Sequence, residues 1–513
     1  MNQKTLLESI KESMTCNWDV LCSYDEEKIN KVLAKKFEAG ENKLVSEIKY
    51  SKKYEDKFRK TTNLYELMLT LKAPKIHFLT GERNICQVDM PIEKGRFTLS
   101  EKRKGEEEFE ELGTEEIKEN EIILRCDVPL SATAGDGIRN EEGKISFVQE
   151  NKTSKIYLHF KHSDLTVFKL IPYSEEVEEN SILFSPDMCS DIMEGVIYAF
   201  LESVDEVQYE LGAVSNSTEY GNELVPKSFI FAAYKAADSA KGCLNIYIQT
   251  QNSGFGQGDS SPAFLVSGSS VSPYPDDPSE DKKYSAALYI KKEVLLDRMI
   301  SPGLPKNITV AFGNDEEKRL EIWYYLDKEV TIPKIKSIPG VSLLKSEDTV
   351  FNINEAPIKL LFDGEAIHVS WTYTFKCRFK GKIGFGVSSM HISETATVVA
   401  VYDDIVDISK ESAESLKIAF NMSEKSKYKF DITTKTGGFP GVFASLDDES
   451  DLERHLKKQL PFSVEDMKLD ISSISVFTVA NILMPGTHIF QFSHKDGVYR
   501  PNDIVMYGNV VDV

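Results

Sequence analysis

The stretch VSWTYTFKCRFK, at Val369–Lys380, alternates apolar and polar side chains without a break. Successive side chains of a strand point to opposite faces of its sheet, so this stretch predicts a strand with one buried and one solvated face. At about 3.3 Å per residue the strand would be about 40 Å long, well above the usual length. A sheet of such strands twists, and it has to curl around something that covers its apolar face.

Three shorter runs repeat the alternation, at 65–71, 156–160 and 244–248. Clean alternation is typical of half-buried strands in antiparallel sheets, because strands of parallel sheets are apolar on both faces. We therefore expect mainly antiparallel sheets, each with one face toward a core.

Few helices are predicted beside these strands. The stretch 25–37 places apolar residues on one face and begins at Asp25, a good N-cap. The stretch 186–211 begins with Ser185 as cap and Pro186 at the first helical position. Shorter helices are predicted at 284–300 and 447–460. The predicted class is α+β, with long curved antiparallel sheets wrapped around long helices in an elongated molecule.

At 513 residues the chain exceeds the size of one core, so we expect two lobes, 1–180 and 181–513. Glycine and serine cluster at 253–261 and through 267–278, which favours an exposed loop or a connection between lobes. The glutamate-rich stretch 105–120 is interpreted as a solvated loop.

Charge and composition exclude several classes of function. The chain carries 61 basic and 82 acidic residues, a net charge of −21, which opposes general attraction to nucleic acid or to an anionic membrane. The first 14 residues lack the apolar core of a secretory signal, and the stretch 471–492 is too polar for a membrane helix. The seven cysteines are scattered and odd in number, so reduced thiols are expected.

No common catalytic motif is present in the sequence. It lacks a Gly-x-Ser-x-Gly elbow, His-Glu-x-x-His, Cys-x-x-Cys and a phosphate-binding Gly-Lys-Ser/Thr loop. We expect no catalytic residue, no cofactor and no metal. His159 and His162 lie near Asp164, but in a strand they would point to opposite faces and would not share an ion. A hydrolase remains an alternative if His368 or His391 meets carboxylates in a cleft.

The most basic window is Lys49–Lys60, in which tyrosines and a phenylalanine alternate with cations. Basic residues near a charged bilayer contribute about 1 kcal/mol each, so the window is a candidate contact for an anionic lipid headgroup. The alternative is a solvated hairpin without a ligand. The headgroup candidates are Lys52, Lys53, Lys57, Arg59 and Lys60.

Both ends of the chain carry short motifs in a fixed order. Trp18-Asp19 precedes a polar turn and a helix that bears Ile29-Asn30. Near the other end, the apolar stretch 475–486 runs into a Pro-containing turn, and Arg500-Pro501-Asn502-Asp503 with Gly508 follows. This arrangement resembles the OrfX and P-forty-seven proteins encoded beside clostridial neurotoxins, members of the tubular lipid-binding (TULIP) superfamily. Cys16-Asn17 departs from the Tyr-Gly that usually precedes Trp-Asp there. By length the chain is most similar to the third OrfX component.

The resemblance implies a TULIP-like fold in both lobes and a non-enzymatic accessory role in a neurotoxin gene cluster. It also implies binding of a lipid, a phosphoinositide or another amphiphile, and assembly with sister OrfX proteins such as the first component. Such a protein is made in the bacterial cytoplasm and released with toxin components. The family residues Trp18, Asp19, Asn30, Pro501, Asp503 and Gly508 are expected to be structural, because Asp, Asn and Pro fix turns.

A lipid tunnel needs an apolar lining. We expect that lining from residues 29–37 and 477–484. The alternative is that these residues fill the core, so that the protein is an interaction scaffold without a lipid. The candidate lining residues are Ile29, Val32, Leu33, Phe37, Phe477, Val479, Ile482, Leu483 and Met484.

Overall fold

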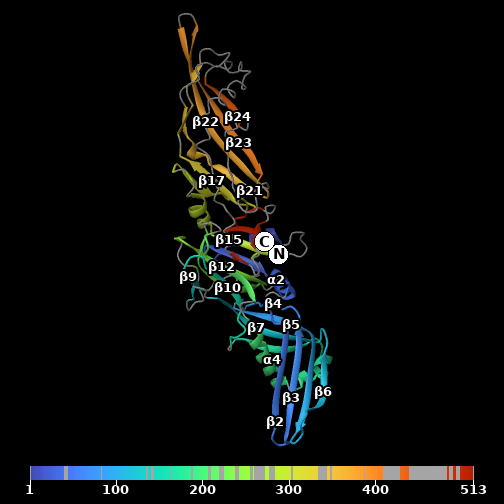
Figure 1. The fold of residues 1–513 in the computed structure, drawn as a ribbon. Coiled ribbons are helices and arrows are strands. Elements are labelled where there is room, and N and C mark those ends of the chain that lie inside the picture. Colours follow the sequence, from blue (N-terminus) through green and yellow to red (C-terminus); the bar gives the residue numbers. More distant parts are fainter. Residues whose placement is uncertain are drawn as a thin grey trace. The chain divides into compact units, whose positions relative to one another are not determined.

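The computed structural model describes most of the chain up to Asp407 and short segments after it (Figure 1). The described residues are 2–39, 44–81, 84–133, 137–139, 144–162, 165–185, 189–205, 209–218, 224–236, 242–254, 258, 272–275, 284–301, 304, 306–327, 329–332, 344–346, 349–385, 388–407, 428–437, 482–483, 489–492 and 497–511.

The chain forms two compact units. Unit 1 comprises Met1–Tyr289, Thr478–Gln491 and Tyr507–Val513, and unit 2 comprises Ile290–Phe477 and Phe492–Met506. The chain thus passes from unit 1 to unit 2 after Tyr289 and not near residue 180, because strands that follow residue 180 complete the sheets of unit 1.

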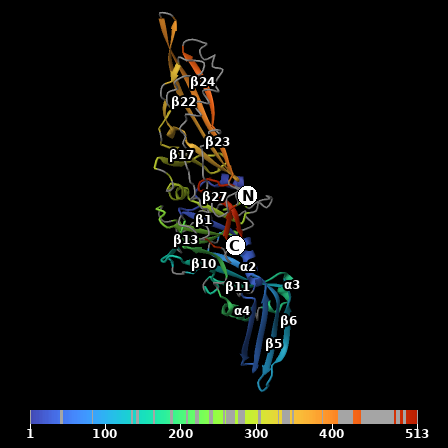
Figure 2. The same ribbon diagram turned by 45° about the horizontal axis from the view of Figure 1, so that its top comes forward.

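The first sheet of unit 1 has the strand order β26-β27-β15-β1-β14-β13-β9-β8 among the described residues. Figure 2 labels β27, β1 and β13 of this sheet. Segments from both ends of the chain therefore meet in one sheet. Its strands are β1 (Val20–Asp25), β8 (Gly137–Arg139), β9 (Ile145–Phe147), β13 (Pro226–Lys235), β14 (Gly242–Thr250), β15 (Ala286–Ile290), β26 (Ile489–Phe492) and β27 (Ile504–Val511).

Strand β14 contains the predicted run 244–248, but every residue of the strand is buried. The expectation of a half-buried strand was wrong here, because the residues between the apolar positions, such as Asn245 and Tyr247, are covered as well. The antiparallel pairing with β1 and β13 is confirmed.

The second sheet of unit 1 carries the long strands. Its path is β2-β3-β5-β7-β10-β12-β25, with β4 and β6 beside β5 and β11 beside β7. The bounds are β2 (Glu47–Asp56), β3 (Thr61–Leu71), β4 (Lys75–Phe78), β5 (Ile85–Arg103), β6 (Glu110–Ile117), β7 (Ile122–Ala132), β10 (Thr153–Leu158), β11 (Val167–Pro172), β12 (Glu210–Ser215) and β25 (Ile482–Leu483).

Strand β6 lies in the glutamate-rich stretch that was predicted to be a solvated loop, and that prediction was wrong. The strand pairs with β5 from Gly95↔Ile117 to Glu101↔Glu110. Its charged side chains are mostly exposed. Strand pairing depends on backbone hydrogen bonds, so a charged sequence does not prevent it.

The helices of unit 1 are α1 (Gln3–Ser9), α2 (Glu26–Ala39), α3 (Glu175–Asn180), η1 (Ile182–Phe184) and α4 (Cys189–Ser203). The predicted helix at 25–37 is confirmed, and the Asp25 carboxylate accepts a hydrogen bond from the Glu27 N–H at 2.5 Å. Helix α4 ends at Ser203, earlier than predicted, and the chain continues into β12. No helix in the described part of the chain is long and apolar enough to cross a membrane.

Helix α4 packs on β2 and β11 of the long sheet. Gly195 allows this approach, because a Cβ at that position would lie 2.2 Å from the Tyr50 ring of β2. On the same helix, the Phe200 ring packs edge-on against the rings of Phe160 and Phe168, with ring centroids 5.2 and 5.5 Å apart. The space between α4 and the sheet is therefore closely filled.

Unit 2 is built on a long antiparallel sheet with the order β16-β17-β21-β22-β23-β24, and β19 lies beside β22. A separate pair joins β18 to β20. The strands are β16 (Ile308–Phe312), β17 (Glu321–Leu326), β18 (Glu329–Ile332), β19 (Leu344–Ser346), β20 (Thr349–Asn352), β21 (Ile358–Asp363), β22 (Ala366–Phe385), β23 (Ser388–Asp407) and β24 (Tyr428–Gly437).

The alternating stretch Val369–Lys380 lies within β22, as predicted. Trp371, Tyr373 and Phe375 are buried on one face and form a stacked row with centroids 6.1 and 6.2 Å apart. The Trp371 indole N–H donates to the Ala356 carbonyl at 3.1 Å, which satisfies the polar atom of this buried ring.

The helical segments in the described part of unit 2 are short: α5 (Lys292–Val294), η4 (Leu295–Ile300) and η6 (Ile353–Glu355). The helix predicted at 284–300 was wrong for its first half, because 286–290 forms the buried strand β15. The helix predicted at 447–460 lies outside the described residues.

Six cysteines, Cys16, Cys22, Cys86, Cys126, Cys243 and Cys377, are buried free thiols, as expected from their scattered positions. Burial raises the pKa of the Cys22 thiol. The Cys22 thiol is accordingly neutral and packs as a small apolar group.

Candidate functional site

The residues of the amino-terminal motif make contacts with backbone. Trp18 and Asp19 are each 1% exposed. One carboxylate oxygen of Asp19 accepts from the backbone N–H of Thr250 at 2.6 Å and from its hydroxyl at 2.8 Å. Asp19 thereby ties the entry of β1 to the end of β14.

Asn30 fastens helix α2 to strand β4. Its side-chain amide donates to the Ile76 carbonyl at 2.9 Å and accepts from the Ile76 N–H at 2.7 Å. The Glu26 carboxylate accepts from the Phe78 N–H at 2.9 Å. Side chains on one face of α2 thus satisfy the free backbone edge of β4.

The carboxy-terminal motif lies at a bend. Pro501 is part of that bend and Asp503 is buried. The Arg500 guanidinium donates to the Gly313 carbonyl and lies over the Phe312 ring. The Gly508 carbonyl accepts from the Ser285 N–H at 3.1 Å.

The apolar residues expected to line a tunnel have different surroundings. Ile29, Val32 and Leu33 are buried on α2, which packs against β1, β4 and β14, while Phe37 is half-buried. The backbone of β25, Ile482–Leu483, pairs with β12. Phe477, Val479 and Met484 lie outside the described residues.

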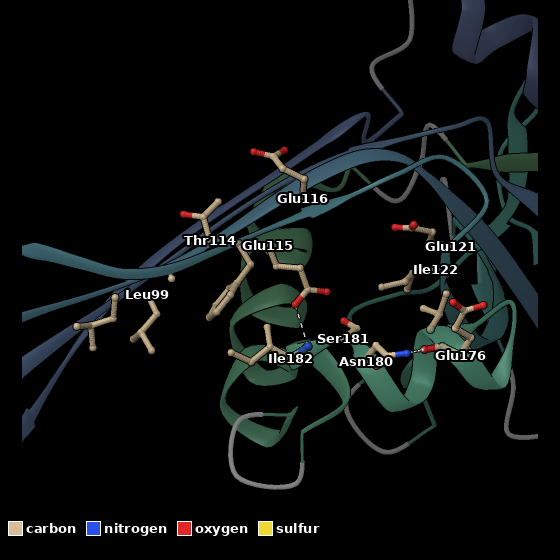
Figure 3. A pocket seen from close by; sticks show the side chains of 14 residues that line it. Leu99, Thr114, Glu115, Glu116, Glu121, Ile122, Glu176, Asn180, Ser181 and Ile182 are labelled. Carbon is tan, nitrogen blue, oxygen red and sulfur yellow. Dashed lines mark hydrogen bonds between the residues drawn. The ribbon is translucent and has the colours of Figure 1, made fainter.

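A pocket of about 1020 Å³ lies elsewhere in unit 1, between β5, β6, the start of β7 and the α3–η1 segment (Figure 3). Phe97 and Ile122 are buried in its wall, and Leu112 is 55% exposed at it. Leu99, Val177 and Ile182 add further apolar surface. None of Ile29, Val32, Leu33 and Phe37 lines this pocket.

The α3–η1 side of the pocket is fixed by hydrogen bonds at its turns. Ser174 caps α3 by accepting from the Val177 N–H at 3.3 Å, and Ser181 caps η1 by accepting from the Leu183 N–H at 3.2 Å. Across the pocket, the Glu115 carboxylate of β6 accepts from the Ile182 N–H at 2.8 Å (Figure 3). This bond holds η1 against the inner face of the strand.

The pocket was not predicted from sequence patterns, because its two walls come from 97–122 and 176–182. The one available signal was the order Gly113, Glu115, Ile117, which has the period of a strand and places all three on one face.

The basic window Lys49–Lys60 covers most of β2 and the turn 57–60 that joins it to β3 in a hairpin. Lys52 lies 3.9 Å from Glu194 and over the Tyr54 ring, and the hydrogen bond with Tyr54 raises the pKa of Lys52. Lys53 lies over the Phe109 ring at 5.3 Å. These two cations contact other side chains of unit 1.

The turn of this hairpin, here called the hairpin tip (Lys57–Lys60), presents three cations and a phenylalanine. Phe58 is 100% exposed, and Lys57, Arg59 and Lys60 are exposed beside it. Arg59 lies 3.8 Å from Asp56, and the Lys60 carbonyl accepts from the Lys104 N–H at 3.0 Å. The tip therefore lies next to the β5–β6 turn, which carries three glutamates, Glu106, Glu107 and Glu108.

The sequence predicted that His159 and His162 point to opposite faces of one strand, and that prediction was wrong. Strand β10 ends at Leu158, the chain turns, and the two imidazole rings meet edge to face with centroids 5.5 Å apart. Among the described residues no group of three or more His, Cys, Asp or Glu side chains could hold a metal ion, and Asp164 lies outside them.

His368 lies 3.8 Å from Asp363, and both side chains are nearly half exposed. Asp363 also accepts from the Arg319 guanidinium at 3.1 Å. The side chain of His391 lies outside the described residues.

No known family model matches the sequence, and no curated protein matches it. Among solved structures, P47 from Clostridium botulinum A2 is similar with a TM-score of 0.44 and 14% identity over 96% of this chain and 98% of that chain. A lipopolysaccharide binding protein is similar with a TM-score of 0.30 and 12% identity over 97% of this chain and 99% of that chain. Both TM-scores and both identities are low, although each likeness spans nearly the whole of both chains.

Proposed function

We propose that this protein is a non-catalytic accessory protein that binds an amphiphile, whose apolar chain lies in the pocket between β5, β6 and the α3–η1 segment. The observation that carries the proposal is the pocket itself. Its volume of about 1020 Å³ is at the upper end of ligand sites in proteins. Its lining combines apolar side chains with glutamates, which suits a molecule with one apolar and one polar end.

Burial of an alkyl chain supplies the binding energy in this proposal. Each methylene removed from water contributes about 0.8 kcal/mol. Leu112 is 55% exposed and would be covered by the same chain, so the protein also loses exposed apolar surface. The opening of the pocket leaves the head of the ligand in contact with the glutamates and with water.

The motifs at Trp18-Asp19 and Pro501–Asp503 support a wider proposal. In it, the chain is an OrfX or P-forty-seven protein of the TULIP superfamily, most like the third OrfX component. It would assemble with sister OrfX proteins, such as the first component, and assist a toxin encoded beside it. Its release with toxin components belongs to the same proposal.

Filling the pocket tests the amphiphile proposal. Gly113 lines the pocket, and a Cβ there meets no atom within 4 Å. Gly113→Leu adds bulk on the face of β6 that carries Glu115, whereas the control Thr98→Leu adds bulk on β5 at a position that does not line the pocket. Displacing about two methylenes of the ligand should weaken binding about tenfold.

The measurement is native mass spectrometry of freshly purified protein, with organic extraction and identification of the released molecule. We expect an extractable amphiphile on the parent and on the Thr98→Leu control, and much less on Gly113→Leu. Equal occupancy of all three proteins would place the ligand elsewhere. A clean apo mass, unchanged after incubation with amphiphiles, would favour the interaction scaffold with a filled core.

The hairpin tip is the proposed contact of unit 1 with a lipid surface. Phe58→Ser should weaken partitioning onto vesicles of phosphatidylcholine and phosphatidylglycerol about tenfold, because burial of a phenylalanine ring contributes about 1.5–3 kcal/mol. Thermal stability should not change, since Phe58 is fully exposed. The matched control is Leu165→Ser, at a position that is 45% exposed outside the hairpin. Equal loss in both variants would exclude a specific role of the tip.

A further inference from the structure

The pocket lining has one sign of charge. Of the 14 described residues that line it, four are glutamates and none is lysine, arginine or histidine. The four are Glu115, Glu116, Glu121 and Glu176.

Three of these carboxylates come from three different segments of the pocket lining (Figure 3). Glu115 points toward η1 from β6, Glu121 lies beside Ile122, and Glu176 lies on α3. Glu116 differs, because it points away from α3 and lies 3.6 Å from the Arg96 guanidinium.

The hydrogen bonds already made leave mainly acceptors at the pocket. Glu115 and Glu121 each use one oxygen, toward the N–H groups of Ile182 and Lys118 at 2.8 and 2.7 Å. A carboxylate has two oxygens and about four acceptor positions, so both groups keep acceptor capacity. The Asn180 amide donates to the Glu176 carbonyl at 2.8 Å, which turns one donor of the rim away from a ligand.

We infer that the pocket selects an amphiphile whose head is a protonated amine. The inference rests on the proposed function and adds the charge of the ligand. An ammonium head on an alkyl chain brings donors and positive charge to a rim of acceptors and negative charge. A phosphoinositide or a fatty acid would bring further negative charge to the same carboxylates, and like charges repel one another. The inference therefore predicts that a phosphoinositide, the ligand implied by the resemblance, does not bind in this pocket.

Three ligands with the same chain test the inference by isothermal titration: decylammonium, decanol and decanoate, each below its aggregation concentration. We expect decylammonium to bind about tenfold more tightly than decanol, and decanoate to bind more weakly than decanol. Added salt should weaken decylammonium binding and leave decanol binding nearly unchanged, because only the first depends on charge.

Substitutions test which carboxylates contribute to the binding of the ammonium head. The double variant Glu121→Gln with Glu176→Gln keeps oxygen acceptors and removes two charges, and it should weaken decylammonium binding about fivefold without changing decanol binding. The matched control is Glu178→Gln, which neutralises an exposed glutamate of α3 that does not line the pocket.

The outcomes separate the inference from the proposed function. If decanol and decanoate bind as tightly as decylammonium, the pocket binds amphiphiles without selecting an amine, and the inference alone fails. If none of the three binds saturably, the amphiphile proposal fails and the inference fails with it. If the control lowers decylammonium affinity as much as the double variant does, the selectivity comes from the overall negative charge and not from the pocket.

Discussion

Truncation of Leu33 to alanine is expected to lower the free energy of unfolding of unit 1 by about 3 kcal/mol. The Leu33 side chain is 0% exposed on the face of α2 that packs against β1, β4 and β14. The helix cannot shift readily to fill the lost volume, because Asn30 and Glu26 hold it to the backbone of β4. The cavity left behind therefore adds to the lost transfer energy.

Hydrogen exchange followed by mass spectrometry is the suitable measurement, because a chain of two compact units does not unfold in one two-state step. Protection of the α2 amides should fall in Leu33→Ala, before and after lipid extraction. The control is Phe37→Ala on the same helix, where the half-buried ring predicts a smaller loss. If the protection of the α2 amides falls in Leu33→Ala only after lipid extraction, α2 lines a ligand-binding cavity.

Replacement of Asp315 by asparagine is expected to cost unit 2 about 2 kcal/mol at neutral pH, because hydrogen bonds to charged groups contribute about 1.5–3 kcal/mol. The Asp315 carboxylate is 13% exposed and accepts from Arg319 Nη2 at 3.0 Å and Nε at 3.1 Å. It also accepts from the backbone N–H groups of Glu317 and Arg319, each at 3.1 Å. Asparagine keeps one acceptor oxygen and places an amide group opposite the guanidinium.

The cost should depend on pH. Burial raises the pKa of Asp315, but the hydrogen bonds and charge of Arg319 outweigh it and hold the pKa below its ordinary value. A carboxyl group with a lowered folded pKa stabilises the fold above its unfolded pKa, and this contribution is lost as the pH falls through the folded value. The difference between the parent and Asp315→Asn should therefore shrink below about pH 4.

Thermal unfolding between neutral and acid pH measures this difference. Asp403→Asn is the matched control, because it removes the same charge at an exposed position of β23 in the same unit. A difference between parent and Asp315→Asn that is constant down to strong acid would exclude the proposed role of the carboxylate charge.

Periodic segments of the fold could be predicted from sequence. Strand β22 and helix α2 each have one buried and one solvated face, so their side chains alternate with the period of the element. Strands buried on both faces, such as β14 and β15, lose that alternation. The prediction for strand β6 was wrong for a different reason. Most of its side chains are exposed and several are glutamates, so its sequence resembles that of a solvated loop.

The pocket could not be predicted, because it depends on which segments meet. Glu115 and Ile182 are separated by 67 positions, and their hydrogen bond forms only when η1 lies under the long sheet. The headgroup candidates were found in sequence as a basic window, but only the fold separates Lys52 and Lys53, which contact other side chains, from the exposed turn at Lys57–Lys60. Charge density is a sequence property, whereas accessibility depends on tertiary contacts.

The place of β27 in the first sheet has a consequence for biosynthesis. The Gly508 carbonyl accepts from Ser285, and the Val510 N–H donates to the Ser285 hydroxyl at 2.9 Å, so β15 obtains its neighbour more than 200 residues after it is made. Until β27 has been synthesised and has left the ribosome, β15 has an unpaired edge that can join another nascent chain. Carboxy-terminal truncations and tags should therefore affect the yield of soluble unit 1, although most of that unit is synthesised first.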